Sequence, residues 1–290
     1  SRHMTAAPAR RILWVDDDVY ELDFWIHQLS MEGYCVETAG DVQSAKQLIA
    51  ANPPDLAILD MMLPLGDDAE SRLEARGGFA SGMVLARWIK INHPTVRFVG
   101  CSVLPDLEVG RFFEQYGCGF IRKTHASGRD IVRLVSHALE TPNPALKLRV
   151  FIVHGHDESA KLELKNYLQN VLTLPEPKIL HELPSTGRSI MEKFEAAAED
   201  VDIVFVLLTP DDKVATATES NKAKWRARQN VIFELGYFLS ALHRRSGRVV
   251  LLHKGPLELP SDISGLTYID ISSGIAAAGE EIRRELAAVM

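Results

Sequence analysis

Short runs of apolar residues alternate with helix-like segments along the whole chain, and this alternation constrains the fold more than any other feature. A run such as Ile203–Leu208 has the length and the β-branched content of a buried strand. The other strand-like runs are Arg11–Val15, Leu56–Leu59, Val96–Cys101, Gly119–Ile121, Arg149–Val153 and Val249–Leu252. Segments with helical spacing are Glu21–Met31, Ile131–Leu139, Ser159–Val171, Ser189–Ala198 and Asn230–His243. Strands that alternate with helices are typical of βα units, so we predict doubly wound parallel sheets of the α/β class.

The segment Glu140–Pro144 interrupts this series. Its two prolines, Pro142 and Pro144, cannot continue a helix and favour an extended connection. At 290 residues the chain is long enough for two domains of ordinary size. We therefore predict a boundary near residue 145, with one domain over residues 10–142 and a second over residues 148–290.

Composition sets the broad class of the protein. Apolar residues make up 46% of the chain and charged residues 24%, which is the range of folded globular proteins. With 32 basic and 39 acidic side chains the net charge is −7, so we expect no DNA partner and no membrane partner. No apolar run reaches the roughly 20 residues that span a bilayer, and we expect a cytoplasmic protein. Ser1–His3 read as the remnant of a cleaved tag before Met4, and the three cysteines as free thiols.

Acidic side chains follow two strand-like runs of the first half. Asp16 and Asp17 come directly after Arg11–Val15, and Asp60 comes directly after Leu56–Leu59. Because ligands bind beyond the carboxyl ends of the strands in a doubly wound sheet, these carboxylates can converge at one edge. Crowded carboxylates need a compensating cation, and Mg²⁺ suits a site made of oxygen ligands.

A hydroxyl and an ammonium group complete this set. Ser102 ends the next strand-like run, and Lys123 ends the last one of the first half. An acceptor carboxylate, a metal site, a hydroxyl donor and an ammonium are the groups that bind and stabilise a phosphoryl group. Each residue alone is more often a helix cap or a solvated loop residue. Their combination, in this order, indicates phosphoryl transfer.

Residues of about 10–140 resemble the receiver domain of two-component response regulators. The resemblance is carried by Leu13–Asp18, Leu59–Pro64, Gly100–Ser102 and Phe120–Lys123. It implies that Asp60 is the phospho-acceptor and that the partner is a sensor histidine kinase or a phosphotransfer protein.

The resemblance also implies the roles of neighbouring residues. The implied Mg²⁺ ligands are Asp17 and Asp60, with Asp16 acting largely through water and Met62 through its carbonyl. Ser102 and Lys123 would bind the phosphoryl oxygens, and Phe120 occupies the position of the family's aromatic switch residue. Two positions depart from the family's pattern. Thr124 stands where the family usually has proline, and residues 65–78 form a longer, charged segment where the family has a short turn. This segment could cover the site, contact another copy of the chain, or be a solvated insertion.

Polar residues also follow strand-like runs in the second half. His154 and Gly155 come after one such run, where a glycine before a helix can present backbone N–H groups to phosphate. Asp211 comes after another and can cap the segment that follows. The basic stretch Lys222–Arg228 contains Trp225 and could stack a base, although a solvated loop is the commoner structure for such a stretch.

Glu234 stands among large apolar residues of the predicted helix Asn230–His243. A carboxylate in such a place must be desolvated, paired or turned into a cleft. The residues leave two interpretations open: a catalytic carboxylate, or a structural salt bridge to Arg226 or Arg228.

Residues of about 148–290 resemble the bacterial TIR-like (Toll/interleukin-1 receptor-like) family, which supplies effector domains in cyclic-nucleotide antiphage defence. The strings that carry the resemblance are Val150–Asp157, Gly187–Phe194, Leu207–Asp212, Ala227–Gly236 and Leu259–Asp262. It implies a flavodoxin-like fold and, in active members, cleavage of the nicotinamide–ribose bond of NAD. It places the catalytic glutamate at Glu234 and a mobile loop near the substrate at Leu183–Ser189. Our candidate nucleotide-binding residues are His154, Gly155, Asp157, Gly187, Arg188, Asp211, Arg228 and Asn230.

These expectations lead to one main hypothesis and one rival. The main hypothesis is a receiver whose phosphorylation controls a TIR-like effector that binds NAD or a related nucleotide and cleaves it. The rival is a non-catalytic signalling module that acts through nucleotide binding or through association of TIR-like domains. A homo-oligomer is expected in either case, and a DNA-binding output is disfavoured because the second half has no helix-turn-helix pattern.

Overall fold

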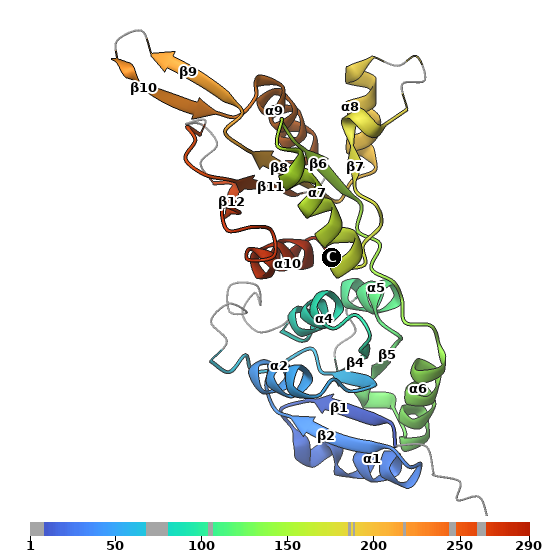
Figure 1. The fold of residues 1–290 in the computed structure, drawn as a ribbon. Coiled ribbons are helices and arrows are strands. Elements are labelled where there is room, and N and C mark those ends of the chain that lie inside the picture. Colours follow the sequence, from blue (N-terminus) through green and yellow to red (C-terminus); the bar gives the residue numbers. More distant parts are fainter. Residues whose placement is uncertain are drawn as a thin grey trace, which may run out of the picture. The chain divides into compact units, whose positions relative to one another are not determined.

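The chain folds into two compact units, residues 1–146 and 147–290, and each unit has its own five-stranded sheet (Figure 1). In this computed structural model the described residues are 9–67, 81–103, 107–184, 187, 189–216, 219–243, 248–259 and 265–290. Side chains are described over the same ranges except for Val19, Glu21, residues 215–216 and 219–223, and His243.

The first unit is built on parallel strands in the order β2-β1-β3-β4-β5. The strands are β1 (Arg11–Val15), β2 (Cys35–Ala39), β3 (Leu56–Leu59), β4 (Arg97–Ser102) and β5 (Phe120–Arg122). This is the flavodoxin-like order, in which the chain reverses its direction of winding between β1 and β3 and opens a crevice at their carboxyl ends. β1 and β3 are buried between the helix layers, where Trp14 and Ile58 have no exposed surface.

Helices cover both faces of this sheet. They are α1 (Val19–Met31), α2 (Val42–Ala51), α4 (Ser81–Asn92), α5 (Leu107–Tyr116) and α6 (Gly128–Glu140). α1 packs beside α6 on one face, and α2 packs beside α4 on the other (Figure 1). Local capping fixes where two of them begin: Asp41 accepts a hydrogen bond from Ser44 N at 2.8 Å, and Ser127 forms a capping box with Asp130.

The second unit repeats the architecture with parallel strands in the order β12-β11-β8-β6-β7. The strands are β6 (Val150–Val153), β7 (Lys178–Ile179), β8 (Ile203–Leu208), β11 (Arg248–His253) and β12 (Thr267–Asp270). β8 lies at the centre and is buried along its whole length, as its continuous apolar sequence predicts. Two parallel sheets with flanking helices confirm the predicted fold class.

The main helices of this unit are α7 (Glu158–Asn166), α8 (Ile190–Glu199), α9 (Gln229–His243) and α10 (Gly279–Ala288). A short π-helical turn, η3 (Tyr167–Val171), continues α7, and a 3₁₀ turn, η4 (Leu180–Glu182), follows β7. α9 packs on the sheet through Val231, Leu235, Phe238 and Leu242, which are all buried. The ring of Phe194 in α8 contacts Phe238 at 5.9 Å and so joins α8 to α9.

An antiparallel hairpin lies between β8 and α9 in the sequence. It consists of β9 (Asp212–Thr216) and β10 (Glu219–Arg226), with Trp225 opposite Lys213 in the register. Most of the basic stretch Lys222–Arg228 is therefore strand rather than the solvated loop that is commoner for such a composition, and the stacking of a base on Trp225 stays untested. The backbone of this stretch pairs with the strand just before it, and Glu258 N donates to Trp225 O at 2.8 Å. This pairing satisfies backbone groups that a loop would leave to water.

No helix within the described ranges combines the length and the apolar character that crossing a membrane requires.

Candidate functional site

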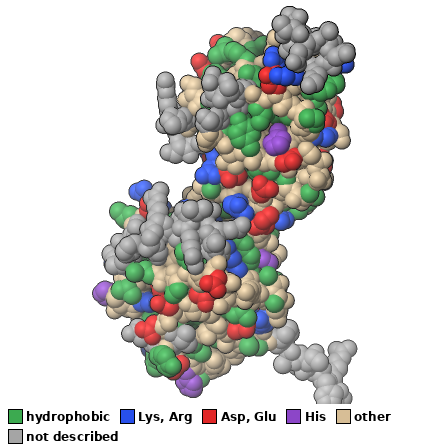
Figure 2. Space-filling model, turned by 90° about the vertical axis from the view of Figure 1, so that its left-hand side faces the viewer, with side chains coloured by type: hydrophobic (Ala, Val, Ile, Leu, Met, Phe, Trp, Pro, Cys, Tyr) green, Lys and Arg blue, Asp and Glu red, His purple; other side chains and the backbone are tan. Residues whose placement is uncertain are grey.

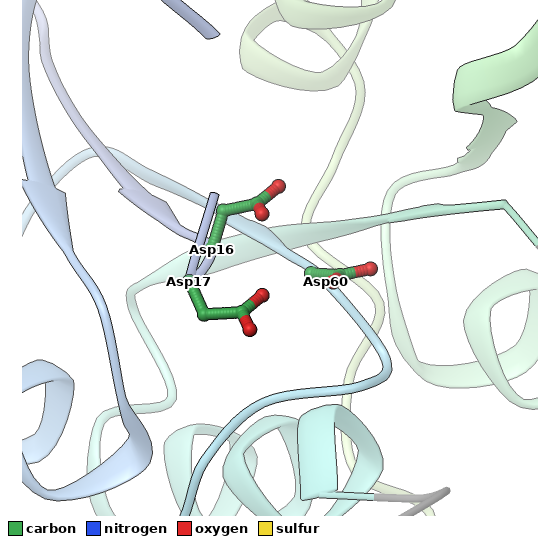
Figure 3. Close-up of side chains that lie close together, drawn as sticks. All are labelled: Asp16, Asp17 and Asp60. Atoms are coloured by element: carbon green, nitrogen blue, oxygen red, sulfur yellow. The ribbon is translucent and has the colours of Figure 1, made fainter. Parts of the chain in front are cut away.

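Three carboxylates lie close together at the carboxyl ends of β1 and β3. Asp16, Asp17 and Asp60 each offer an oxygen within 4.8 Å of the others. Figure 3 shows them on the two loops that follow these strands. Asp16 and Asp60 are buried, whereas Asp17 is exposed. Val15 and Leu59, the last residues of the two strands, pair in register, and this pairing brings the acids that follow them together.

Lys123 and Ser102 reach the same edge from the neighbouring strands. Lys123 directly follows β5, and its Nζ lies 2.5 Å from Asp16 Oδ2 and 3.4 Å from Asp60 Oδ2. Ser102 is buried at the end of β4, where it pairs in register with Arg122. Four strand ends therefore contribute the side chains for which phosphoryl chemistry was predicted.

The charges in this pocket influence one another. Burial raises the pKa of Asp60 above its ordinary value; Lys123 opposes this rise and the charge of Asp16 adds to it. Burial lowers the pKa of Lys123, but the hydrogen bond to Asp16 and the charges of Asp16 and Asp60 outweigh burial, so the pKa lies above its ordinary value. The ammonium therefore stays protonated at neutral pH and holds the two buried carboxylates together.

The pocket has the chemistry of an Mg²⁺ site. Its ligand atoms are carboxylate oxygens, and among the described ion pairs Lys123 is the one cation, paired with Asp16 and Asp60, which leaves an excess of negative charge. Asp17 is exposed and leaves one side open to water, as Mg²⁺ requires. Met62, the predicted carbonyl ligand, follows Asp60 by two residues and has a side chain that is 44% exposed.

Phe120 lies inward and is half-buried. Its ring centre is 5.8 Å from that of Phe113, and a Cβ on Gly100 would lie 2.4 Å from Phe120 Cδ2. The absence of a side chain at Gly100 is therefore what leaves room for the ring beside β4. Thr124 lies in a 3₁₀ turn (Lys123–His125), with Oγ1 2.8 Å from His125 Nδ1. Residues 68–78 of the predicted insertion lie outside the described residues.

In the second unit, polar residues gather at the carboxyl ends of β6 and β8. A Cβ on Gly155 would lie 1.8 Å from Asp211 Oδ2, so glycine permits this close approach of two loops. Asp211 Oδ1 accepts a hydrogen bond from Thr209 at 2.9 Å, but the buried Oδ2 has no hydrogen-bond partner among the described residues. His154 Nδ1 lies 2.9 Å from Gly155 O, and its buried Nε2 also has no partner there.

The protonation of His154 follows from these contacts. Burial lowers the pKa of His154, which favours the neutral ring. Because the carbonyl of Gly155 can only accept, Nδ1 carries the proton and Nε2 presents a lone pair. Two buried acceptors, His154 Nε2 and Asp211 Oδ2, thus have no donor among the described residues.

Asp157 has a structural role. It caps α7 by accepting from Ala160 N at 2.9 Å, and its other oxygen accepts from Lys254 Nζ at 2.8 Å. The bond to Lys254 holds the pKa of Asp157 below its ordinary value. Both carboxylate oxygens are therefore engaged within the protein and tie α7 to the end of β11.

The other predicted nucleotide-binding residues are dispersed. Arg228 is half-buried and Asn230 is exposed, both at the start of α9. Gly187 lies in an exposed turn with φ of +73°, a conformation that favours glycine. Arg188 and parts of the Leu183–Ser189 loop lie outside the described residues.

Glu234 is a buried carboxylate on α9, with 7% of its surface exposed. Burial raises the pKa of Glu234 to about 7, and the charge of Arg228 partly opposes this rise. None of the ion pairs among the described residues includes Glu234. Arg226 pairs instead with Glu258 at 2.6 Å, and Arg228 acts on Glu234 through its charge without forming an ion pair, so neither arginine forms the considered salt bridge among the described residues.

A pocket of about 550 Å³ lies at the base of the hairpin. Its lining includes Asp212, Val214, Arg226, Gln229, Ile232 and Glu258. Glu234 is not part of this lining, because Ile232 and Glu234 lie about 200° apart around α9. The sequence analysis missed Gln229, Ile232 and Glu258, since nothing in the sequence joins position 226 to position 258.

The described surface carries both signs of charge. On the face in Figure 2, acidic and basic side chains are interspersed among polar and hydrophobic ones. Among the described side chains visible on that face, no extended basic area of the kind that binds nucleic acid stands out.

A family model described as "CAP12/Pycsar effector protein, TIR domain" matches residues 149–273. Protein tirC of Dictyostelium discoideum is 30% identical over 145 residues, which are 47% of this chain and 70% of that protein. The uncharacterized protein YuaY of Escherichia coli K12 is 42% identical over 134 residues, 45% of this chain and 43% of YuaY.

Response regulators match the N-terminal half. Response regulator MprA of Mycolicibacterium vanbaalenii is 45% identical over 60 residues, 21% of this chain and 26% of MprA. The crystal structure of the receiver domain of NtrX from Brucella abortus is 30% identical and covers 45% of this chain and 99% of that domain, with a TM-score of 0.38. The chain thus spans less than half the length of YuaY and of MprA. From these matches and the geometry above, the chain belongs to the CAP12/Pycsar TIR-domain effector family and carries a response-regulator receiver domain in its N-terminal half.

Proposed function

We propose that this protein is an effector in which phosphorylation of the receiver controls cleavage of NAD, or a related nucleotide, by the TIR domain. The observation that carries the proposal is Glu234: a buried carboxylate without an ion pair among the described residues, in a TIR domain of an effector family. A charge in such an environment acts strongly on a developing positive charge, because little water screens it.

The receiver half would take its phosphoryl group from a sensor histidine kinase or a phosphotransfer protein. A carboxylate oxygen of Asp60 attacks the phosphorus atom of the donor, and the bond from phosphorus to the donor breaks. Lys123, 3.4 Å from Asp60, and Ser102 at the end of β4 then stabilise the phosphoryl oxygens. When bound to Asp16, Asp17, Asp60 and the Met62 carbonyl, Mg²⁺ would neutralise part of the phosphoryl charge.

The TIR half would break the bond between nicotinamide and ribose. Nicotinamide leaves as a neutral group, so no proton donor is required. Positive charge develops on the ribose in an oxocarbenium-like transition state, and the Glu234 carboxylate stabilises that charge and orients ribose hydroxyls. A water molecule then forms a bond to the ribose carbon that nicotinamide has left and loses a proton to solvent, so that the products are nicotinamide and ADP-ribose. Since burial raises the pKa of Glu234 to about 7, the ionised form and with it the rate should increase as the pH rises through 7.

The release of nicotinamide from NAD tests this proposal. We expect the Glu234→Gln variant to lose at least about a hundredfold in rate, because the amide keeps the volume of the side chain and removes its charge. The control is Glu281→Gln, the same change at an exposed position of α10. A folded Glu234→Gln protein with the wild-type rate would exclude the catalytic role.

The hairpin pocket supports the rival function, a TIR module that binds a nucleotide without cleaving it. The pocket combines the Arg226–Glu258 pair with the apolar side chains of Val214 and Ile232, and it lies away from Glu234. Calorimetric titration with NAD separates the two functions: heat of binding without any nicotinamide release, in wild type and Glu234→Gln alike, favours the module.

Association of TIR domains is a second part of the proposal. Ile190 in α8 and Phe233 in α9 are 63% and 57% exposed, and the ring of Phe194 lies 6.1 Å from that of Phe233. Exposed apolar side chains on adjoining helices support a contact between copies of the chain. We expect light scattering to show a larger mass once a phosphoryl mimic is added. A monomer with full NAD-cleaving activity would contradict this expectation.

A further inference from the structure

The ammonium group of Lys90 is buried without a carboxylate to pair with it. Lys90 lies in the last turn of α4 and is 2% exposed. None of the ion pairs among the described residues includes it; its Nζ donates to Asn143 Oδ1 at 3.2 Å and to the carbonyl oxygen of Pro144. The ring of Phe98 lies 5.6 Å from Nζ. Because a buried ammonium is costly without hydrogen bonds, the position of Lys90 depends on these two acceptors.

The side-chain amide of Asn143 also bonds to the loop between α4 and β4. Its Nδ2 donates to Pro94 O at 2.8 Å and to Val96 O at 3.4 Å, and both acceptors lie between α4 and β4. Three residues later, Leu146 is buried. Residues 141–146, which we call the connecting segment, are the last residues of the first unit, and the chain continues from them into the second. The connecting segment is therefore held at the end of α4.

The other end of α4 is fastened to the loop that carries Asp60. Ser81 Oγ accepts from Leu63 N at 2.8 Å and donates to Met61 O at 3.2 Å. A Cβ on Gly82 would lie 2.0 Å from the carbonyl oxygen of Asp60, so glycine brings the helix into direct contact with that backbone. The backbone of the predicted phospho-acceptor is therefore in direct contact with the first turn of α4.

We propose that α4 transmits a displacement of the Asp60 backbone to the connecting segment, through the contact of Lys90 with Asn143 and Pro144. Gly82 and Lys90 are about 12 Å apart along the helix axis. A closely packed helix shifts as one body, so a displacement at the Asp60 backbone reaches Lys90 at the far end. The phosphorylation state of Asp60 then changes how firmly the connecting segment is held. The inference rests on the proposed phosphorylation of Asp60.

Hydrogen exchange of the full-length protein, followed by mass spectrometry, tests the coupling. Peptides that cover the connecting segment are compared without additions and with Mg²⁺ plus beryllofluoride, a phosphoryl mimic. In the wild type we expect the mimic to change the exchange of these peptides. In Lys90→Met, which keeps the length of the side chain and removes its donors, we expect exchange at least about tenfold faster without the mimic, and no response to it.

Two further variants keep the outcome interpretable. Asn143→Ala breaks the same contact from a half-exposed position and should reproduce the effect even if Lys90→Met fails to fold. Lys46→Met removes an ammonium of α2 that lies 5.5 Å from the ring of Trp88, a residue of α4. This change should leave the hydrogen exchange of the connecting segment unchanged.

Three results would overturn the coupling. The first is hydrogen exchange of the connecting segment in Lys90→Met and Asn143→Ala that is as slow as in the wild type. The second is a change of that exchange in these variants when the mimic is added. The third is exchange in Lys46→Met that is as fast as in Lys90→Met. A separate mass measurement shows whether Asp60 accepts a phosphoryl group. If it does not, the proposed phosphorylation is wrong, and the comparison without mimic still decides whether Lys90 holds the segment.

Discussion

The two units present polar side chains at the same place, the carboxyl ends of parallel strands, but they balance charge there differently. In the receiver unit, Lys123 lies within 3.4 Å of Asp60 and closer still to Asp16, so the buried acids have a cation between them. In the TIR unit, Asp211 Oδ2 and His154 Nε2 have no partner among the described residues, and Glu234 forms no ion pair there.

This difference indicates what each edge is built to receive. The first has the ammonium of Lys123 close to two buried carboxylates and the hydroxyl residue Ser102 at the neighbouring strand end, which suits an incoming anion such as a phosphoryl group. The second has two buried acceptors without donors among the described residues, which suits a ligand that brings hydroxyl or amide hydrogens. Similar folds can thus serve opposite charge requirements, because the side chains after each strand vary while the strand order stays fixed.

The largest expected effect concerns the receiver side of the comparison. Asp60→Asn should abolish the gain of phosphoryl mass when the protein is treated with a small-molecule phosphodonor and Mg²⁺, because the amide is a poor nucleophile. Intact-protein mass spectrometry measures this. Asp18→Asn, at an exposed neighbouring acid, is the control that should keep the mass gain. An equal gain in Asp60→Asn would remove the phosphoryl assignment from this edge.

The next effect concerns the close approach at Gly155 in the TIR unit. A methyl group there would meet Asp211 Oδ2 at 1.8 Å, so Gly155→Ala should lower the free energy of unfolding by about 1–3 kcal/mol. Gly236→Ala in α9 meets nothing within 4 Å and should instead raise it by about 0.5–1 kcal/mol, because alanine favours the helix. Urea denaturation of both variants checks the opposite signs; equal effects would mean that the Gly155 contact relaxes freely.

The smallest effect concerns the ionisation of Glu234. Burial raises its pKa from 4.5 to about 7, so the folded protein binds more protons than the unfolded chain between these values. Stability contributed by this group is therefore lost as the pH rises from 4.5 through 7. Glu234→Gln has no such loss, so its free energy of unfolding should increase relative to that of the wild type as the pH rises from 4.5 to 8. Parallel pH dependence of the two unfolding curves would show that Glu234 is solvated.

The central strands were predictable from the sequence because burial on both faces leaves a continuous apolar run. β1, β3 and β8 have the predicted bounds, and α9 begins one residue earlier than predicted. The edge strands β2 and β12 were not predicted, since each is only partly buried and its sequence mixes polar with apolar residues. β7 has only two residues, too few for a pattern. The β9–β10 hairpin was missed because its basic, polar sequence is also typical of a loop.

The convergence of the receiver acids could be predicted because a parallel sheet places all carboxyl ends at one edge. Contacts between distant residues could not. Lys254 is 97 residues from Asp157, and Glu258 is 32 residues from Arg226. Nor does the sequence show that Lys90, in an ordinary helical pattern, is fully covered by the segment at residues 143–144. Such pairs depend on how loops pack, which periodicity does not encode.

The two acceptors beside Gly155 have a consequence for ligand screening. A buried acceptor without a donor destabilises the folded state by about 1–3 kcal/mol. A compound that reached and donated to either His154 Nε2 or Asp211 Oδ2 would remove this penalty as well as adding its own contacts, and it would bind only the folded chain. The melting temperature of the TIR unit should therefore rise with such compounds in proportion to the donors they present, including nucleotides that the protein never cleaves.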